Sequence, residues 1–167
     1  MRKTKNLIGK VALVTGATGQ LGRVFSRGLA NNGATVWVSD INLEKCKEIV
    51  DQLEEETGRK HYSSCMDVTS EESVVKTMGE IQNNSGQLDI LINNAGTAVF
   101  SDYLSRSKEE FMSVVEVNLY GSFLCIQKAS VLMEKENNSG SIINIGSIYG
   151  MVSGDPGIYT DCNRNTS

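Results

Sequence analysis

Thr15-Gly16-Ala17-Thr18-Gly19-Gln20-Leu21-Gly22 follows an apolar run, residues 11–14, and precedes a helix-like stretch, residues 23–31. A strand, a tight glycine turn and a helix N-terminus in this order form a cradle for a pyrophosphate. Glycines let the backbone approach the phosphates, and the first N–H groups of the helix attract negative charge. The motif is weak alone but has the context that it requires. It therefore indicates nucleotide binding, with a purely structural turn as the alternative.

Short apolar segments alternate with amphipathic ones along the rest of the chain. This rhythm predicts an α/β fold, a doubly wound parallel sheet of the Rossmann type, in one domain spanning residues 1–167. After the last expected strand no helix follows to cover the sheet edge. We therefore expect the domain to be incomplete at its C-terminus, with a native flexible tail as the alternative. The expected strands are 10–15, 34–39, 61–66, 88–93 and 140–146, and the expected helices are 20–32, 42–57, 70–83 and 107–135.

Composition excludes several classes of function. The 167 residues carry a net charge of −4, which argues against nucleic acid as a partner. No apolar run is long enough to span a bilayer, so we expect neither a membrane span nor a signal peptide. The cysteines at positions 46, 65, 125 and 162 lack any CxxC spacing. We therefore expect no metal site and free thiols in a cytoplasmic protein.

Two acidic residues follow expected strands. Asp40 comes directly after the strand 34–39, where a carboxylate accepts both ribose hydroxyls of an adenosine and repels a 2′-phosphate. This position favours NAD over NADP, and the alternative is an aspartate that caps the next helix. Asp67, followed by Val68, comes after the third expected strand. Its carboxylate is placed either to meet the adenine amino group or to act as a plain loop residue.

The segment from Leu88 to Gly96 is more informative than either acid. It reads Leu-Asp-Ile-Leu-Ile-Asn-Asn-Ala-Gly, a buried strand that ends in two asparagines. Buried amides need hydrogen-bond partners, and the small Ala95 and Gly96 leave room for a ribose and a nicotinamide. We expect Asn94, Ala95 and Gly96 to border the cofactor.

Together these motifs resemble those of the short-chain dehydrogenase/reductase family. The resemblance also rests on Asn118 in Val-Asn-Leu-Tyr-Gly and on Ser147 in Gly-Ser-Ile-Tyr-Gly, so it covers residues 10–150 in the order of the family. It implies a NAD(P)-dependent oxidoreductase that acts on an alcohol or carbonyl substrate. The residues expected to bind the cofactor are Thr15, Gly16, Thr18, Gly19, Gln20, Leu21, Gly22, Asp40, Asp67, Val68, Asn94, Ala95 and Gly96.

The glycine turn departs from the family pattern at one position. The single-domain branch usually has glycine where this chain has Gln20, whereas the spacing of Gly16, Gly19 and Gly22 resembles the extended, nucleotide-sugar branch. The Asn-Asn-Ala-Gly segment and Asn118 favour the single-domain branch. An epimerase or dehydratase of the extended branch is one alternative, and a non-catalytic nucleotide-binding module is another.

The resemblance also implies the catalytic groups. Family members use a serine, a tyrosine and a lysine for proton chemistry and an asparagine that supports a water relay. Ser147 matches the serine, and Asn118 matches the asparagine, whose alternative role is a buried amide bonded to the helix backbone. Tyr159 lies near the position expected for the tyrosine, one residue short of the usual spacing from Ser147. It is followed four residues later by Asn163, where the family pattern has lysine.

We therefore expect the true tyrosine and lysine to lie beyond Ser167, and residues 1–167 to be inactive alone, with an enzyme that has lost its lysine as the alternative. Tyr159 is then a residue of an active-site loop. Similar relatives indicate a sugar-derived substrate, and the family implies a homodimer or homotetramer built through the helix 107–135.

Overall fold

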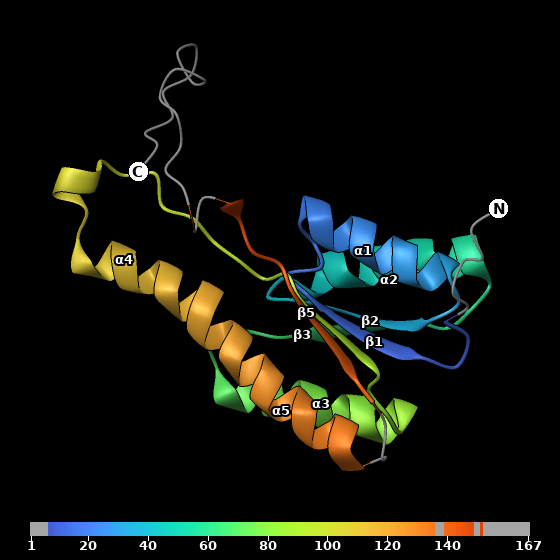
Figure 1. Cartoon of the computed structure of the whole chain (residues 1–167). Helices are drawn as coiled ribbons and strands as arrows, with labels where there is room; N and C mark the ends of the chain where they lie inside the picture. The colour runs from blue at the N-terminus through green and yellow to red at the C-terminus, as the bar shows by residue number, and fades with distance from the viewer. Residues whose placement is uncertain (1–6, 136–138, 149–150, 152–167) are drawn as a thin grey trace.

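The computed structural model describes residues 7–135, 139–148 and 151, and it contains one parallel five-stranded sheet in the order β3-β2-β1-β4-β5 (Figure 1). The chain runs outward from the central strand β1 through β2 to β3 and then crosses over to β4 and β5 on the other side of β1, which makes the sheet doubly wound and confirms the predicted fold class. The strands are β1 (Val11–Thr15), β2 (Thr35–Asp40), β3 (Tyr62–Cys65), β4 (Ile90–Asn93) and β5 (Ser141–Asn144).

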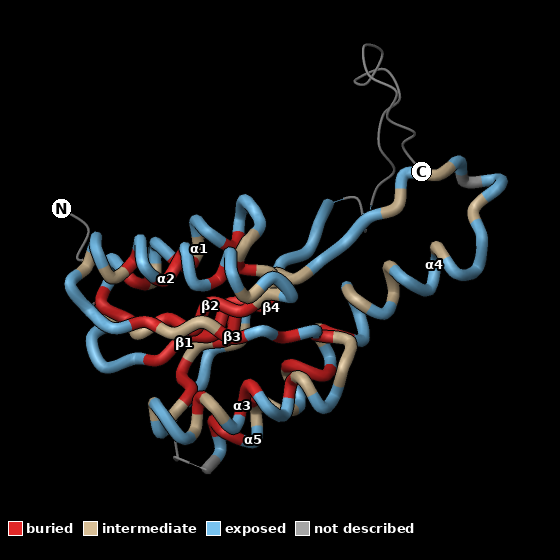
Figure 2. Tube along the Cα trace, turned by 180° about the vertical axis from the view of Figure 1, so that it is seen from behind, coloured by how far each residue is buried: buried red, intermediate tan, exposed pale blue. Residues whose placement is uncertain are grey.

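Helices cover both faces of this sheet. Helices α1 (Gln20–Asn31) and α2 (Leu43–Thr57) lie on one face, and α3 (Glu71–Ser85) and α5 (Ser122–Lys135) lie on the other (Figure 1). All five residues of β1 are buried because the strand has neighbours on both sides and helices above and below (Figure 2). Each layer of helices packs on its own apolar cluster. Parallel strands place their carboxyl ends at one edge, so residues 15, 40, 65 and 93 end side by side.

The ends of α2 and α3 follow ordinary capping rules. The side chain of Asn42 accepts a hydrogen bond from Lys45 N at the start of α2, and Gly58 ends that helix in the left-handed conformation, with φ 65°. Asn42 is therefore the cap of α2. The alternative that Asp40 caps this helix is wrong.

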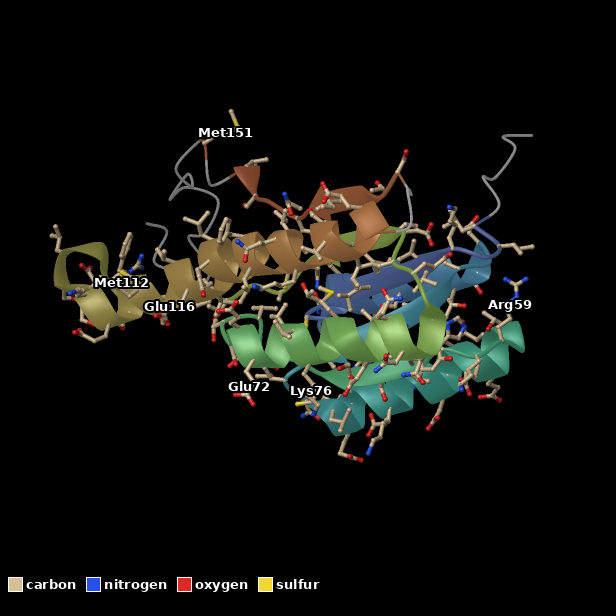
Figure 3. The ribbon with its side chains drawn as sticks, turned by 90° about the horizontal axis from the view of Figure 1, so that it is seen from below. Arg59, Glu72, Lys76, Met112, Glu116 and Met151 are labelled. Atoms are coloured by element: carbon tan, nitrogen blue, oxygen red, sulfur yellow. The ribbon has the colours of Figure 1, made fainter. Side chains whose placement is uncertain are left out.

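The helix expected over residues 107–135 is not one continuous α-helix. It consists of α4 (Lys108–Val115), a π-helical segment η2 (Glu116–Gly121) and α5, and a short 3-10 turn η1 (Tyr103–Ser105) precedes it. The apolar stripe is buried at Cys125, Ala129 and Leu132 but exposed at Phe111. Helix α4 extends beyond the sheet and carries Met112, with Glu116 just after it (Figures 2 and 3). No helix of the described residues is long and apolar enough to cross a membrane.

His61, the one histidine of the chain, joins α2 to the sheet. It is 2% exposed, and its Nδ1 accepts a hydrogen bond from Val36 N at 3.1 Å. The proton of the neutral ring therefore resides on Nε2, which lies 3.0 Å from the hydroxyl of Thr57. Burial lowers the pKa of His61 below its ordinary value of 6.5, because the charged ring would lose water.

The stability of the fold is expected to fall as the pH is lowered from 7.5 to 5.5. The unfolded chain protonates His61 near pH 6.5, whereas the folded chain resists protonation, so acid favours unfolding. The slope from this group cannot exceed that of one proton, about 1.4 kcal/mol per pH unit. Urea unfolding of the wild type and of His61→Gln at several pH values measures the difference. Equal pH slopes in the two proteins would contradict the assignment.

Candidate functional site

The carboxyl ends of β1 and β4 are joined by side chains. Thr15 Oγ1 accepts hydrogen bonds from Asn94 N at 3.1 Å and from Ala95 N at 3.0 Å. In return, Asn94 Nδ2 donates to the carbonyl oxygens of Thr15 at 3.0 Å and of Gly16 at 2.9 Å. Four hydrogen bonds therefore fix the glycine turn against the Asn-Asn-Ala-Gly segment, so two motifs 78 residues apart in the chain form one unit.

Close packing explains two of the glycines. Gly16 has φ +60°, and a Cβ atom there would lie 2.6 Å from Ala95 Cα. A Cβ atom at Gly22 would lie 2.6 Å from Ala17 Cα, so any side chain at this position would push α1 away from the turn. Helix α1 starts after Gly19 with no side-chain cap and no acidic residue in its first turn. Its N-terminus therefore offers backbone N–H groups and a positive dipole end to an anion.

Asp40 connects the end of β2 with this turn. Its Oδ2 accepts two hydrogen bonds from Thr18, one from the backbone N at 3.1 Å and one from Oγ1 at 2.8 Å. Its Oδ1 accepts a longer contact of 3.4 Å from Asn42 N. The acid predicted to contact a ribose is therefore held beside the predicted pyrophosphate turn.

Two cavities open at this edge of the sheet, and both are lined by Gly16, Asp40 and Gly96. The first has a volume of about 520 Å³ and lies between the ends of β2 and β3 and the start of η2. The second has a volume of about 410 Å³ and lies over the glycine turn. The first cavity is further lined by Ile41, Met66, Asp67, Val68, Thr69, Ala95, Thr97, Ser113, Glu116 and Val117, and the second by Thr18, Gly19, Gln20, Leu21 and Asn94.

The structure thus brings together most residues that the sequence predicts for cofactor binding. Two of them, Thr15 and Gly22, line neither cavity and act through the packing of the turn. Asp67 borders the first cavity, where its Oδ1 accepts hydrogen bonds from Thr69 N at 2.8 Å and Thr69 Oγ1 at 2.7 Å. Val68 is held by Gly121 of η2, where a Cβ atom would lie 2.6 Å from Val68 Cγ2.

Several lining residues were not predicted as site residues from the sequence. Ile41 follows Asp40 and Met66 precedes Asp67 in the sequence, so both could have been predicted as neighbours of these two site residues. Glu116 and Val117 come from the start of η2, beside Asn118 (Figure 3 labels Glu116). No sequence signal places this part of the helix over the end of β3.

Asn118 lies in η2 and binds the loop that follows β4. Its Oδ1 accepts from Thr97 N at 2.8 Å, and its Nδ2 donates to Thr97 O at 3.0 Å. The side chain is exposed and bonded to another segment, so the alternative of a buried amide bonded to its own helix is wrong. The carbonyl oxygen of Asn118 accepts a hydrogen bond from Ser122 Oγ at 3.0 Å, as serine hydroxyls in helices often donate to the carbonyl four residues earlier.

Ser147 follows β5 at the same edge of the sheet. Asn93 Nδ2 donates to Asn144 Oδ1 at 2.9 Å, and Ile145 N donates to Asn93 O at 2.9 Å, which fixes the chain just before the serine. Ser147 is exposed and lines neither of the two cavities. Tyr159 lies outside the described residues.

The described cysteines do not form a reactive group. Burial raises the pKa of the Cys46 and Cys125 thiols to about 12, so both stay protonated at neutral pH. Cys65 is exposed and donates to Ile41 O at 3.5 Å. Within the described part of the chain, no group of three His, Cys, Asp or Glu side chains is arranged to hold a metal ion.

Comparison with known proteins agrees with this geometry. A sequence model of the short chain dehydrogenase family matches residues 10–159. The chain is 38% identical over 144 residues to a 3-oxoacyl-[acyl-carrier-protein] reductase, FabG, of Aquifex aeolicus, a match covering 86% of this chain and 58% of the reductase.

Solved structures give the same result. The fold superimposes with a TM-score of 0.88 on a short-chain type dehydrogenase/reductase from Mycobacterium marinum, at 29% identity, over 92% of this chain and 60% of that one. It superimposes with a TM-score of 0.83 on an NAD⁺-bound xylitol dehydrogenase, at 33% identity, over 88% of this chain and 56% of that one. The chain spans a little more than half the length of the relatives that it matches.

The stability of the fold is expected to depend on the Thr15 hydroxyl, which links the segments that follow β1 and β4. Thr15→Val keeps the shape of the side chain but leaves the N–H groups of Asn94 and Ala95 without their acceptor. Both N–H groups belong to half-buried residues, so we expect the free energy of unfolding in urea to fall by about 1–3 kcal/mol in total. Thr15→Ser, which keeps the hydroxyl, serves as the control. A Thr15→Val variant as stable as the wild type would show that these two hydrogen bonds do not stabilise the fold.

Proposed function

The chain belongs to the short-chain dehydrogenase family, and we propose that it forms the cofactor-binding part of a NAD-dependent oxidoreductase for an alcohol or carbonyl substrate. The proposal rests above all on one arrangement. A carboxylate, Asp40, stands where the cavity over the glycine turn meets the cavity beyond β2. A dinucleotide with two phosphates and a ribose fits this division of the site into an anion-binding part and a hydroxyl-binding part.

The residues present fit such a cofactor. The turn from Gly16 to Gly22 and the N-terminus of α1 would hold the pyrophosphate through backbone N–H groups. Asp40 would accept ribose hydroxyls, and Asp67 with Val68 would border the adenine. When bound, the nicotinamide supplies hydride transfer to or from the substrate carbon.

Asp40 favours NAD over NADP for an electrostatic reason. A 2′-phosphate carries negative charge at neutral pH, and the half-buried Asp40 carboxylate would stand beside it and repel it. The residues lining the two cavities include no lysine or arginine that would compensate this charge.

The substrate side of the site would be served by Ser147 and Asn118. The Ser147 hydroxyl, in the segment that follows β5, would hydrogen-bond a substrate oxygen and so polarise its carbon–oxygen bond. The Asn118 amide is occupied by Thr97, so a water relay here would use backbone carbonyl oxygens of η2 and not the amide itself. The relatives differ in substrate by their names, so we propose the class of alcohols and carbonyls, with a sugar-derived compound as the narrower candidate.

Isothermal titration of residues 1–167 with NAD and with NADP tests the cofactor proposal. We expect NAD to bind at least about tenfold more tightly, which corresponds to about 1.4 kcal/mol. Asp40→Asn, which removes the charge, should weaken NAD binding and narrow this preference. Asp51→Asn makes the same charge change on the exposed face of α2, outside both cavities, and should leave both affinities unchanged. Equal affinity of the wild type for the two nucleotides would contradict the role of Asp40.

The same protein, saturated with NAD, is expected to oxidise no alcohol at a measurable rate. None of the five tyrosines within residues 1–167 is followed four residues later by a lysine. Residues 1–167 therefore lack the Tyr-x-x-x-Lys pattern in which the lysine ammonium lowers the pKa of the tyrosine. Absorbance at the NADH band during incubation with a panel of alcohols and sugar alcohols measures this. Turnover at ordinary dehydrogenase rates, on the order of 1–10³ per second, would show that another group moves the proton.

A further inference from the structure

The Asp40 carboxylate does not use its two oxygens alike. Oδ2 accepts from both the N–H and the hydroxyl of Thr18, at 3.1 and 2.8 Å. A carboxylate oxygen has two lone pairs, so these two donors saturate Oδ2. Oδ1 makes a single long contact of 3.4 Å with Asn42 N, which leaves it acceptor capacity for a ligand hydroxyl.

Thr18 is itself held firmly. Its carbonyl oxygen accepts from Arg23 Nε at 3.0 Å, and the residue before it, Ala17, donates its N–H to Ser39 O at 3.0 Å. The turn is therefore fixed to α1 on one side and to β2 on the other. A carboxylate bonded twice to such a residue keeps one orientation, because leaving it would break two charge-assisted hydrogen bonds.

We propose that Thr18 is a positioning residue that holds Asp40 in place and so strengthens the selection of NAD against NADP, an inference that rests on the proposed function. An unrestrained aspartate can turn its side chain away from a 2′-phosphate and so reduce the repulsion. Here that movement is opposed by the bonds from Thr18. The same bonds occupy the Thr18 N–H and hydroxyl, two donors that a 2′-phosphate would otherwise take.

Isothermal titration of Thr18→Val and Thr18→Ser with NAD and NADP tests this proposal. Thr18→Val removes the hydroxyl and should weaken NAD binding about threefold to tenfold while lowering the ratio of the NADP to the NAD dissociation constant at least threefold. Thr18→Ser keeps the hydroxyl and should retain the wild-type ratio. Urea unfolding checks that each variant is folded, and Thr18→Ala replaces the valine variant where that one is not.

A matched control lies on the rim of the first cavity. Thr69 bonds Asp67 as Thr18 bonds Asp40, with its N–H and its hydroxyl on one carboxylate oxygen. Asp67 is proposed to border the adenine, which NAD and NADP share. Thr69→Val should therefore change both affinities by the same factor and leave their ratio unaltered.

The Asp40→Asn background separates positioning from a general structural effect. If Thr18 acts through the carboxylate, Thr18→Val should not change the NADP to NAD ratio further once the charge is gone. A ratio that Thr18→Val leaves unchanged in the wild type, or lowers equally in Asp40→Asn, would overturn the inference while leaving the proposed function intact. A wild-type chain that binds neither nucleotide would overturn the proposed function and this inference together.

Discussion

The site depends on the hydrogen bonds that join Thr15 and Gly16 to Asn94 and Ala95. They connect the turn after β1 to the turn after β4, and they need a hydroxyl, an amide and a glycine of positive φ at the same place. The Ala95 backbone packs directly against Gly16, and the next two residues, Gly96 and Thr97, line the first cavity. Asn118 then holds Thr97 from η2. These hydrogen bonds thus link three segments that are far apart in the sequence: the glycine turn, the segment after β4 and η2.

The break in the long helix is explained by what it contacts at this edge. Val68, in the loop after β3, comes so close to Gly121 that a side chain at position 121 would collide with it. Asn118, one turn earlier, must face Thr97. A wider π-helical turn accommodates both contacts, and π-helical turns inside α-helices are frequent at functional sites. Helix α4 is consequently directed away from the sheet, and Phe111 stays exposed although it continues the apolar stripe of α5.

Sequence reasoning succeeded where local pattern decides the outcome. The apolar runs of β1 and β4 and the acid at the end of β2 follow from burial and from parallel topology, so the strands and the place of Asp40 were predictable. It did not reveal which way a polar side chain faces. Thr15 turns into the protein and not toward the cavities, and the Asn118 amide is used by a residue 21 positions away. Such outcomes depend on tertiary contacts that periodicity does not encode, as does the change from one helix to α4, η2 and α5.

The charges around the cavities explain how an acidic site can be suited to an anionic cofactor. Asp40, Asp67 and Glu116 all line the first cavity, so that cavity repels anions and accepts hydroxyl and amino donors. The second cavity adds uncharged residues of the glycine turn and the dipole of α1. In the proposed binding mode, the backbone N–H groups of the glycine turn would attract the two phosphates, and a third phosphate on the ribose would have to enter the acidic cavity. Because three acids line the first cavity without a compensating cation among the lining residues, the proposed discrimination by charge would be a property of the whole cavity, and Asp40 held by Thr18 would be its most firmly positioned part.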